Sequence, residues 1–506
     1  MNRLAGRNDR AASLTRRFDV IVVGVGGMGS AAIYQLARQG KRALGLERYD
    51  IPNEMGSSHG HTRIIRLAYS EDPIYVTLLK RAYELWREIQ KHVGEQLLHI
   101  TGSIDVGVSD SWVFKGSLQS CIEHDLPHEV LTGAELTERF PGYRLPHDYL
   151  AVLQPEGGFL SPERCIVSYV LAAQAHGAEV HGREEVLDWE PVGDGVRVTT
   201  DRDVYEADRL VVTAGAWNDQ LLDCLRGLIL PERQVLAWLQ PERPELFTPE
   251  RFPVFNMLAD DGRYYGFPVF GVPGFKFGKY HHFEESGHAD VLDRECHPYD
   301  EQMLREFAAR YFPDAVGPTM SLKACLFTNT PDSHFLIDLH PDYPQVCFAS
   351  ACSGHGFKFA SVIGEILADL AMRGRSRHDI SFFSLDRLRG DRWQVKSDRW
   401  QRTGERRRVA WDRWRVTGVA PRTADYSPRS GAEPGGRRQT TVPGAMRSGA
   451  AVGRRYPAAY MPGAEVGGRW PAAGGRIKGL PDWREGYPEA SGVVAALAND
   501  AIEPPW

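Results

Sequence analysis

The chain has 506 residues, of which 42% are hydrophobic and 25% are charged, which is ordinary for a globular protein of two or more domains. No apolar run reaches the roughly 18 residues that a membrane-spanning helix needs, so no membrane association is expected. The net charge of −6 hides an acidic body, −14 over residues 1–390, and a basic tail, +8 over residues 391–506. An acidic body argues against nucleic acid as a partner.

Seven cysteines are scattered along the chain without a Cys-x-x-Cys pair. This pattern argues against a disulfide framework and a zinc site, and it favours a reducing, cytoplasmic compartment. Residues 1–17 are rich in arginine, which is also typical of an organelle presequence or a twin-arginine signal. Only a short apolar stretch, residues 20–23, follows, so we interpret residues 1–17 as an N-terminal extension of a cytoplasmic protein.

A strand–turn–helix–strand pattern covers residues 18–47. Its turn has the spacing G-x-G-x-x-G, formed by Gly24, Gly26 and Gly29, and its second strand ends in Glu47. The first glycine permits a tight turn, the second lets a pyrophosphate approach the backbone, and the third lets helix and strand pack closely. The carboxylate of Glu47 can accept hydrogen bonds from ribose hydroxyls. The pattern predicts a bound dinucleotide, FAD or NAD, and the acid argues against NADP.

Hydrophobic patterns later in the chain predict a divided first domain. Residues 73–93 have the spacing of an amphipathic helix, and residues 208–217 are typical of a buried parallel strand that ends in small residues. Such a strand belongs in the nucleotide-binding sheet, which is therefore built from separated segments. Residues 231–320 contain antiparallel-type strand patterns and predict a second domain.

Four cations lie where a positive charge is costly or close to the expected nucleotide. Arg63 and Arg66 are either surface ion-pair partners or a clamp for a carboxylate. Lys276 lies between two phenylalanines on a half-buried strand, where it either extends to solvent or is held for electrostatic work. Lys358 is expected in the first turn of a helix, where a cation opposes the helix dipole and indicates an anionic partner.

Together these landmarks resemble the monomeric sarcosine oxidase family, which includes N-methyl-L-tryptophan oxidase and related amine oxidases with covalent FAD. The resemblance covers residues 18–386 and depends on separated motifs: the glycine fingerprint, residues 56–66, residues 264–268, Lys276, Ala324-Cys325 and residues 353–359. It implies an α/β plus α+β fold, with a discontinuous Rossmann-like FAD-binding domain and an antiparallel-sheet substrate domain. The first would comprise residues 18–95, 150–222 and 320–388, and the second residues 96–149 and 223–319.

The resemblance also implies residue roles. Cys325 matches the cysteine that bonds to a methyl group of the flavin, and Lys276 matches the lysine that stabilises developing superoxide. Arg66 and Lys358 match the pair that holds the substrate carboxylate. The remaining implied catalytic residues are Arg63, His355 and Tyr265. The implied cofactor contacts are Gly24, Gly26, Gly29, Glu47, Arg48, Ser57, Cys325, Gly354, Gly356, Phe357 and Lys358.

The implied activity is FAD-dependent oxidation of a secondary amino acid, of sarcosine or N-methyl-L-tryptophan type. Oxygen is the acceptor, and the products are the amino acid, formaldehyde and hydrogen peroxide. Ser58 and His61 stand where the family pattern often has a histidine and an aspartate. An oxidase of cyclic or other secondary amines, such as pipecolate, is the alternative. An NAD-dependent dehydrogenase is a weaker alternative, because it leaves Cys325 unexplained. A monomer without a metal site is expected.

Residues 389–506 fall outside the resemblance. They are rich in glycine, proline and arginine, and neither a helical nor a strand period persists in them. We interpret them as a low-complexity, disordered tail rather than a nucleic-acid-binding one, because acids are interspersed among the arginines.

Overall fold

The computed structural model describes residues 16–350 and 353–388. The expectation of a disordered tail over 389–506 therefore concerns residues outside this description. Strand β1 (Arg16–Val23) overlaps the last two residues of the predicted N-terminal extension, residues 1–17. Its first two residues pair in parallel with strand β12 (Val204–Val212).

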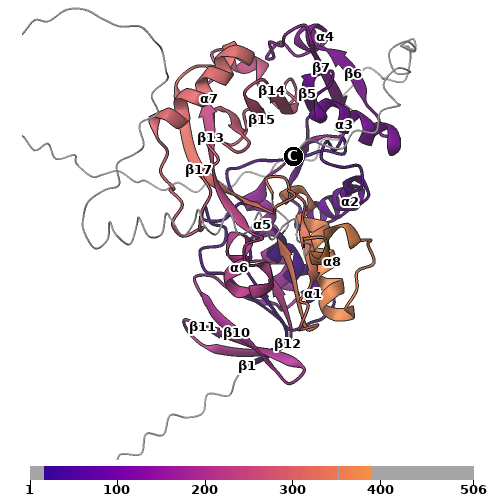
Figure 1. Ribbon diagram of the computed structural model, residues 1–506, viewed down its shortest axis with the longest axis vertical. Helices are drawn as coiled ribbons and strands as arrows, with labels where there is room; N and C mark the ends of the chain where they lie inside the picture. The colour runs from indigo at the N-terminus through magenta and orange to yellow at the C-terminus, as the bar shows by residue number, and fades with distance from the viewer. Residues whose placement is uncertain (1–15, 351–352, 389–506) are drawn as a thin grey trace, which may run out of the picture. The chain divides into compact units, whose positions relative to one another are not determined.

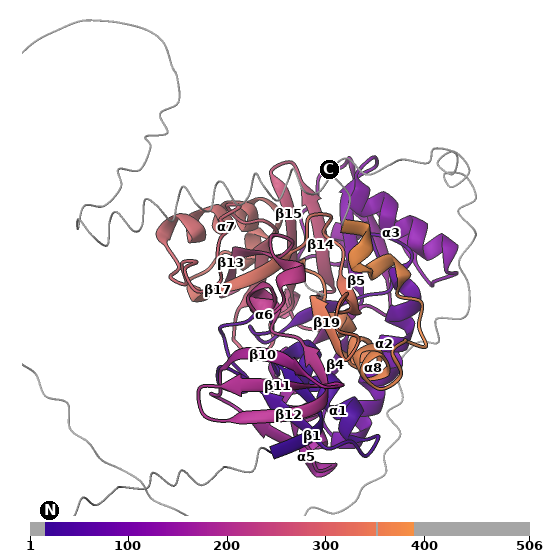
Figure 2. The same cartoon turned by 60° about the horizontal axis from the view of Figure 1, so that its bottom comes forward.

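The first sheet has eight strands and is discontinuous in sequence. Its order is β10-β11-β12-β1-β2-β9, and β19 pairs with β12 and with β18. Figure 2 shows β10, β11, β12 and β1 in this order. The strands at its centre are parallel, as buried Val- and Leu-rich segments favour. The further strands are β2 (Ala43–Leu46), β9 (Glu179–His181), β10 (Val186–Val192), β11 (Gly195–Thr200), β18 (Leu336–Leu339) and β19 (Val346–Ser350).

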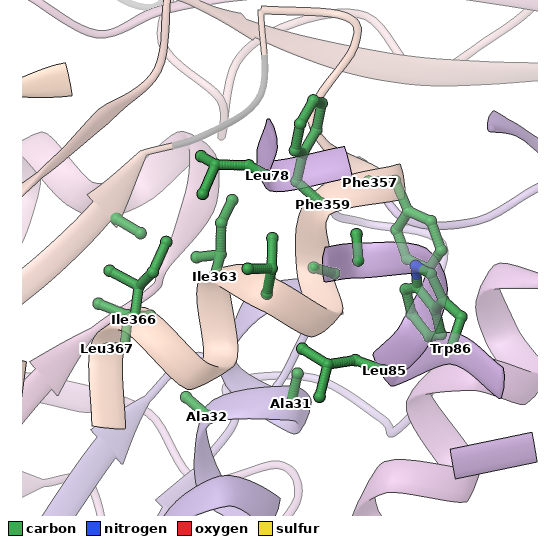
Figure 3. Close-up of a cluster of buried hydrophobic side chains, with 14 of the residues drawn as sticks. Ala31, Ala32, Leu78, Leu85, Trp86, Phe357, Phe359, Ile363, Ile366 and Leu367 are labelled. Carbon is green, nitrogen blue, oxygen red and sulfur yellow. The ribbon is translucent and has the colours of Figure 1, made fainter. Parts of the chain in front are cut away.

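Four helices build the largest core cluster beside this sheet: α1 (Gly27–Ala37), α2 (Tyr75–Val93), α5 (Pro162–Ala175) and α8 (Ala360–Arg373). Helices α1, α5 and α8 contact its strands, and α2 packs on α5 and α8. Helices α1 and α8 approach closely because of Gly364, where a Cβ would lie 2.6 Å from the Ala31 Cβ. Figure 3 shows Ile363, Ile366 and Leu367 of α8 in this cluster with residues of α1 and α2.

The second sheet has the order β17-β13-β16-β15-β14-β5-β7-β6. Its neighbours are antiparallel, except that β14 and β5 are parallel. The predicted domain boundaries at 150 and 320 differ from this topology, because they assign β7 and β17 to the other domain. The strands are β5 (Ser103–Val108), β6 (Glu129–Thr132), β7 (Tyr149–Gln154), β13 (Leu230–Leu239), β14 (Val254–Ala259), β15 (Gly262–Phe267), β16 (Phe275–Lys279) and β17 (Thr319–Asn329).

Helix α7 (Pro298–Tyr311) packs on the second sheet, and the sequence patterns did not predict it. Its Phe307 ring stacks on Tyr264 of β15 at 3.6 Å, and Figure 1 shows α7 beside β13 and β17. Further helices in this half are α3 (Trp112–Glu123) and α4 (Gly133–Arg139), while the short α6 (Asn218–Leu221) follows β12. Among the described helices, none is long and apolar enough to cross a membrane.

A third, three-stranded sheet carries the first arginine of the predicted site. Its order is β3 (Arg63–Ile65), β8 (Gly158–Leu160) and β4 (Leu98–Ile100). Lys358 lies in the 3-10 turn η5 (Phe357–Phe359) and not in the first turn of the α-helix as predicted, since α8 begins at Ala360.

Candidate active site

The first glycine turn joins β1 to α1 and packs as its spacing predicts. Gly24 has φ +86°, and a Cβ on Gly29 would lie 1.8 Å from the Gly24 carbonyl oxygen. A Cβ on Gly26 would meet no described atom within 4 Å, which leaves room for a ligand. Glu47 accepts a hydrogen bond from the Val25 N–H (2.9 Å), and burial raises the pKa of its carboxyl. The N–H groups that begin α1 have no partner within a helix, so this turn suits a pyrophosphate.

A second glycine turn, just before η5, lies against the first. Gly354 has φ +76°, and a Cβ there would lie 2.6 Å from the Phe327 ring. The Phe357 ring lies 3.0 Å from where a Gly27 Cβ would be, so it contacts the first turn. The same ring stacks on Trp86 of α2, with centroids 6.0 Å apart (Figure 3). Phe357 thus fixes the spacing of the two turns.

Cys325, Arg63 and Ser57 converge from distant parts of the chain. Cys325, on β17, is 3% exposed, and its sulfur lies 3.6 Å from Nη2 of Arg63. The same nitrogen donates to the Ser57 carbonyl (2.7 Å), and Nη1 donates to the Thr62 carbonyl (2.9 Å). The guanidinium of Arg63 is thus fixed beside the Cys325 sulfur.

His59 carries a buried imidazole with unmet hydrogen-bonding capacity. It is 1% exposed, and neither ring nitrogen has a partner among the described residues. Burial, and then Arg63, hold its pKa well below the usual value, so the ring is neutral. A buried polar group without a partner is destabilising, and the polar edge of a flavin would satisfy it. The residues of both glycine turns and the imidazole of His59 therefore fit FAD.

Lys276, on β16, is 2% exposed and is held by partners rather than extended to solvent. Its ammonium donates to the Gly60 carbonyl (2.7 Å), the Thr62 carbonyl (2.8 Å) and the Thr62 hydroxyl (2.9 Å). The Phe267 ring lies 4.4 Å from the same nitrogen. Burial, and then Arg63, lower the pKa of Lys276, whereas the three acceptors favour its cation.

The imidazole of His355 is fixed in one orientation. Its Nε2 lies 3.0 Å from the Ser333 carbonyl, which can only accept, so Nε2 carries the proton. Nδ1 then accepts from the Tyr69 hydroxyl at 2.5 Å. Burial lowers the pKa of His355 to about 3, which keeps the ring neutral. Both ring nitrogens of His355 are hydrogen-bonded within the protein, so neither is free to accept a proton from a substrate. The ring therefore contributes to the shape of the site.

Five charged side chains form one cluster: Arg66, Lys358 and Asp105 are buried, and the side chains of Arg263 and Glu71 are 11% and 10% exposed. Arg66 pairs with one Glu71 oxygen (3.0 Å) and with Asp105 (3.3 Å), and Arg263 pairs with the other Glu71 oxygen (2.7 Å). Burial lowers the pKa of Lys358, and Arg66 lowers it further. The two acids pair with the two arginines, and no acid among the described residues lies within ion-pair distance of Lys358, so an anionic ligand would stabilise its cation.

Donors remain open within this charged cluster. Nη1 of Arg66 has no hydrogen-bond partner among the described residues, and Nζ of Lys358 has one, the His355 carbonyl at 2.8 Å. The Tyr69 ring lies 5.1 Å from the Arg66 guanidinium carbon and 5.3 Å from Lys358 Nζ, so both cations lie beside the same ring. Open, buried cationic donors beside one ring are suited to a carboxylate.

The sequence reasoning missed three members of the cluster: Glu71, Asp105 and Arg263. The available signal was a charged residue inside a strand pattern, as Asp105 is between Ile104 and Val106. Burying such a residue requires a partner, which only the pairing of distant strands supplies.

Two predicted residues lie at the margins of the site. Tyr265 is half-buried and packs beside Cys325, and burial raises the pKa of its hydroxyl. Arg48 pairs with Glu185 (3.2 Å) and Asp290 (3.1 Å), so its charge is already matched by protein acids.

The two glycine turns, the unpaired imidazole and the buried cations together define a flavin-dependent oxidoreductase. Residues 19–370 match the family described as FAD dependent oxidoreductase (DAO), and the chain belongs to this family.

Two relatives show which oxidases within this family the chain is similar to. The chain is 42% identical to monomeric sarcosine oxidase of Bacillus sp. over 379 residues, which cover 74% of this chain and 98% of the relative. It is 35% identical to N-methyl-L-tryptophan oxidase of Yersinia pestis, over 74% of this chain and 100% of the relative. These similarities confirm the predicted family: the chain belongs with the sarcosine and N-methyl-L-tryptophan oxidases.

Solved structures confirm the fold class. NikD, an unusual amino acid oxidase essential for nikkomycin biosynthesis, is 27% identical with a TM-score of 0.64, over 73% of this chain and 98% of that one. L-proline dehydrogenase from P. horikoshii shares the fold at 20% identity, with a TM-score of 0.64 over 74% of this chain and 98% of that one.

Proposed function

We propose that this enzyme oxidises small secondary amino acids, of sarcosine or N-methyl-L-tryptophan type, with oxygen as acceptor. For an N-methyl substrate, the carbon–nitrogen bond of the methyl group is oxidised to an imine, and water converts the imine to formaldehyde and the free amino acid. Oxygen takes up the two electrons and becomes hydrogen peroxide. The single observation that carries the proposal is the pair of open cationic donors, Arg66 and Lys358, beside one aromatic ring.

The chain's own residues bind and orient the substrate in this proposal. Nη1 of Arg66 and Nζ of Lys358 hold its carboxylate, while the neutral ring of His355 shapes the pocket. FAD, held by the two glycine turns, Glu47 and Ser57, accepts the hydride equivalent when it is bound. Arg63 contacts Cys325 and donates to the Thr62 carbonyl, to which Lys276 also donates. Its guanidinium would therefore add positive electrostatic potential beside a flavin bound at Cys325.

Lys276 is the residue we assign to the oxygen reaction. It is a buried cation with three fixed acceptors, so it is already oriented when negative charge develops on oxygen. Tyr265, beside Cys325, completes the wall of the substrate space.

We further propose that Cys325 bonds covalently to a methyl group of the flavin: the thiol would lose its proton, the methyl group would lose a hydride equivalent, and oxygen would take up both and become hydrogen peroxide. Cys325→Ser should retain the fold and FAD binding, because the side chain is nearly isosteric, but it should release its flavin on denaturation. The wild-type flavin should stay with the precipitated protein after acid treatment, on a peptide that contains Cys325. The matched control is Cys347→Ser, a buried cysteine on β19, which should keep the covalent flavin. Release of flavin from the wild type would contradict the bond.

A peroxide-release assay on purified protein tests the function. We expect peroxide and formaldehyde in equal amounts with N-methyl amino acids, and little with primary amino acids. Peroxide from pipecolate without activity on N-methyl amino acids would favour the cyclic-amine alternative. No peroxide from any secondary amino acid, with the flavin bound, would contradict the proposal.

We also propose the compartment in which the enzyme acts and its oligomeric state. We propose a reducing, cytoplasmic location, because the seven cysteines are scattered along the chain without a Cys-x-x-Cys pair. We propose that the enzyme acts as a monomer, and light scattering of the full chain checks this.

A further inference from the structure

Arg263, on β15, has a setting that the proposed chemistry leaves unexplained. Its side chain is 11% exposed, its Nε donates to Asn256 (2.7 Å), and one terminal nitrogen pairs with Glu71 (2.7 Å). The flat guanidinium lies between two rings, with its carbon 4.0 Å from the Tyr280 centroid and 4.8 Å from that of Trp112. Such stacking fixes the plane of the side chain and so the direction of its N–H groups.

Arg263 borders the same space as the carboxylate site. It shares Glu71 with Arg66, each arginine taking one carboxylate oxygen. On its other side, the Tyr280 ring lies 5.1 Å from Tyr265 and 5.3 Å from Phe327, the ring that packs on the glycine turn. A chain of ring contacts therefore runs from Arg263 to the second glycine turn.

One terminal nitrogen of Arg263, Nη1, has no hydrogen-bond partner among the described residues. A fixed guanidinium with an open N–H group is suited to a carboxylate. An amino acid with an uncharged side chain has one carboxylate, which Arg66 and Lys358 hold in the proposed function. A substrate with an acidic side chain has a second carboxylate, which is ionised at neutral pH and can pair with Arg263.

We propose that Arg263 is a specificity-determining residue that binds a second carboxylate, on the substrate side chain, and selects acidic N-methyl amino acids. The inference rests on the proposed function and names its substrate class. In this proposal Arg66 and Lys358 bind the α-carboxylate of the substrate, and Arg263 binds the carboxylate of its side chain. Asn256 holds Arg263 in place by accepting a hydrogen bond from its Nε. Asp105 in turn holds Asn256, whose amide donates to it at 2.7 Å.

The test compares each acidic substrate with its carboxamide analogue, which has nearly the same size. In the wild type, kcat/KM for N-methylaspartate and N-methylglutamate should exceed that for N-methylasparagine and N-methylglutamine by about 10- to 100-fold, as for a charge-assisted hydrogen bond. Oxidation of sarcosine without any preference for acid over amide would overturn this inference and leave the proposed function standing. No oxidation of any N-methyl amino acid would overturn both.

A variant ties the preference to this side chain. Arg263→Gln should bring the acid-to-amide ratio of kcat/KM close to one, whereas Arg263→Lys should restore part of it. The matched control is Arg310→Gln, which removes an exposed arginine paired with Asp260 and should keep the wild-type ratio. An unchanged ratio in Arg263→Gln would overturn the inference. If that variant fails to fold, the wild-type comparison alone decides.

Discussion

Replacing Lys276 with methionine is expected to slow the reaction of the reduced enzyme with oxygen by about 100- to 1,000-fold, the usual loss when one preorganised electrostatic group is removed. Methionine keeps the length and the apolar stem but loses the charge. Reduction by substrate under anaerobic conditions should change much less, because Arg66 and Lys358 are untouched. Stopped-flow measurement of the two half-reactions separates the effects.

The control for this variant is Lys279→Met, on the same strand but facing Asp261. It should leave the oxygen reaction at the wild-type rate. If Lys276→Met reacts with oxygen normally while reduction is also normal, the role assigned to Lys276 is wrong.

The rate at which the reduced enzyme reacts with oxygen is expected to fall as pH rises. Burial, and then Arg63, lower the pKa of Lys276, so its cation is present below that pKa and is lost as pH rises through it. The wild-type oxygen reaction should therefore slow with rising pH, beginning at a lower pH than an ordinary lysine would give. Lys276→Met should lack this phase.

Replacing Lys358 with methionine should raise KM for carboxylate substrates by about 10- to 100-fold, the loss expected for a charge-assisted hydrogen bond. Lys358 is a cleaner target than Arg66, because removing Arg66 would leave Glu71 and Asp105 buried with weaker compensation. Steady-state kinetics with sarcosine measure the change.

A substrate without the carboxylate is the internal control. The efficiency with a simple N-methyl amine, already low in the wild type, should be nearly unchanged in Lys358→Met. Equal losses for the amine and for sarcosine would show that Lys358 supports the fold rather than the carboxylate.

The sequence predicted the nucleotide-binding turn because its determinants are local. Gly24, Gly29 and Glu47 act within one strand–helix–strand unit, and their spacing is readable directly. The α/β plus α+β fold was also predictable, since buried and alternating strand patterns differ. The domain boundaries were harder, because β7 and β17 join the second sheet through pairings with distant strands.

The charged cluster could be predicted only in part. From residues alone, Arg66 was as compatible with a surface ion pair as with a carboxylate clamp, and only the family resemblance joined it to Lys358. Glu71 and Arg263 meet through the packing of the loop after β3 against β15, which no local pattern encodes. Helix α7 was not predicted, although its buried Leu304, Phe307, Ala308 and Tyr311 follow a helical spacing that is readable in the sequence.

The central claim is that a secondary amino acid, held by its carboxylate at Arg66 and Lys358, delivers electrons to a bound flavin. Anaerobic titration of the purified protein with sarcosine or another N-methyl amino acid tests it most directly, by the visible absorbance of the flavin. The yellow colour should bleach at low substrate concentration, and far more substrate should be needed for an amine that lacks the carboxylate. Persistent colour at saturating N-methyl amino acid, or equal bleaching by both compounds, would contradict the claim.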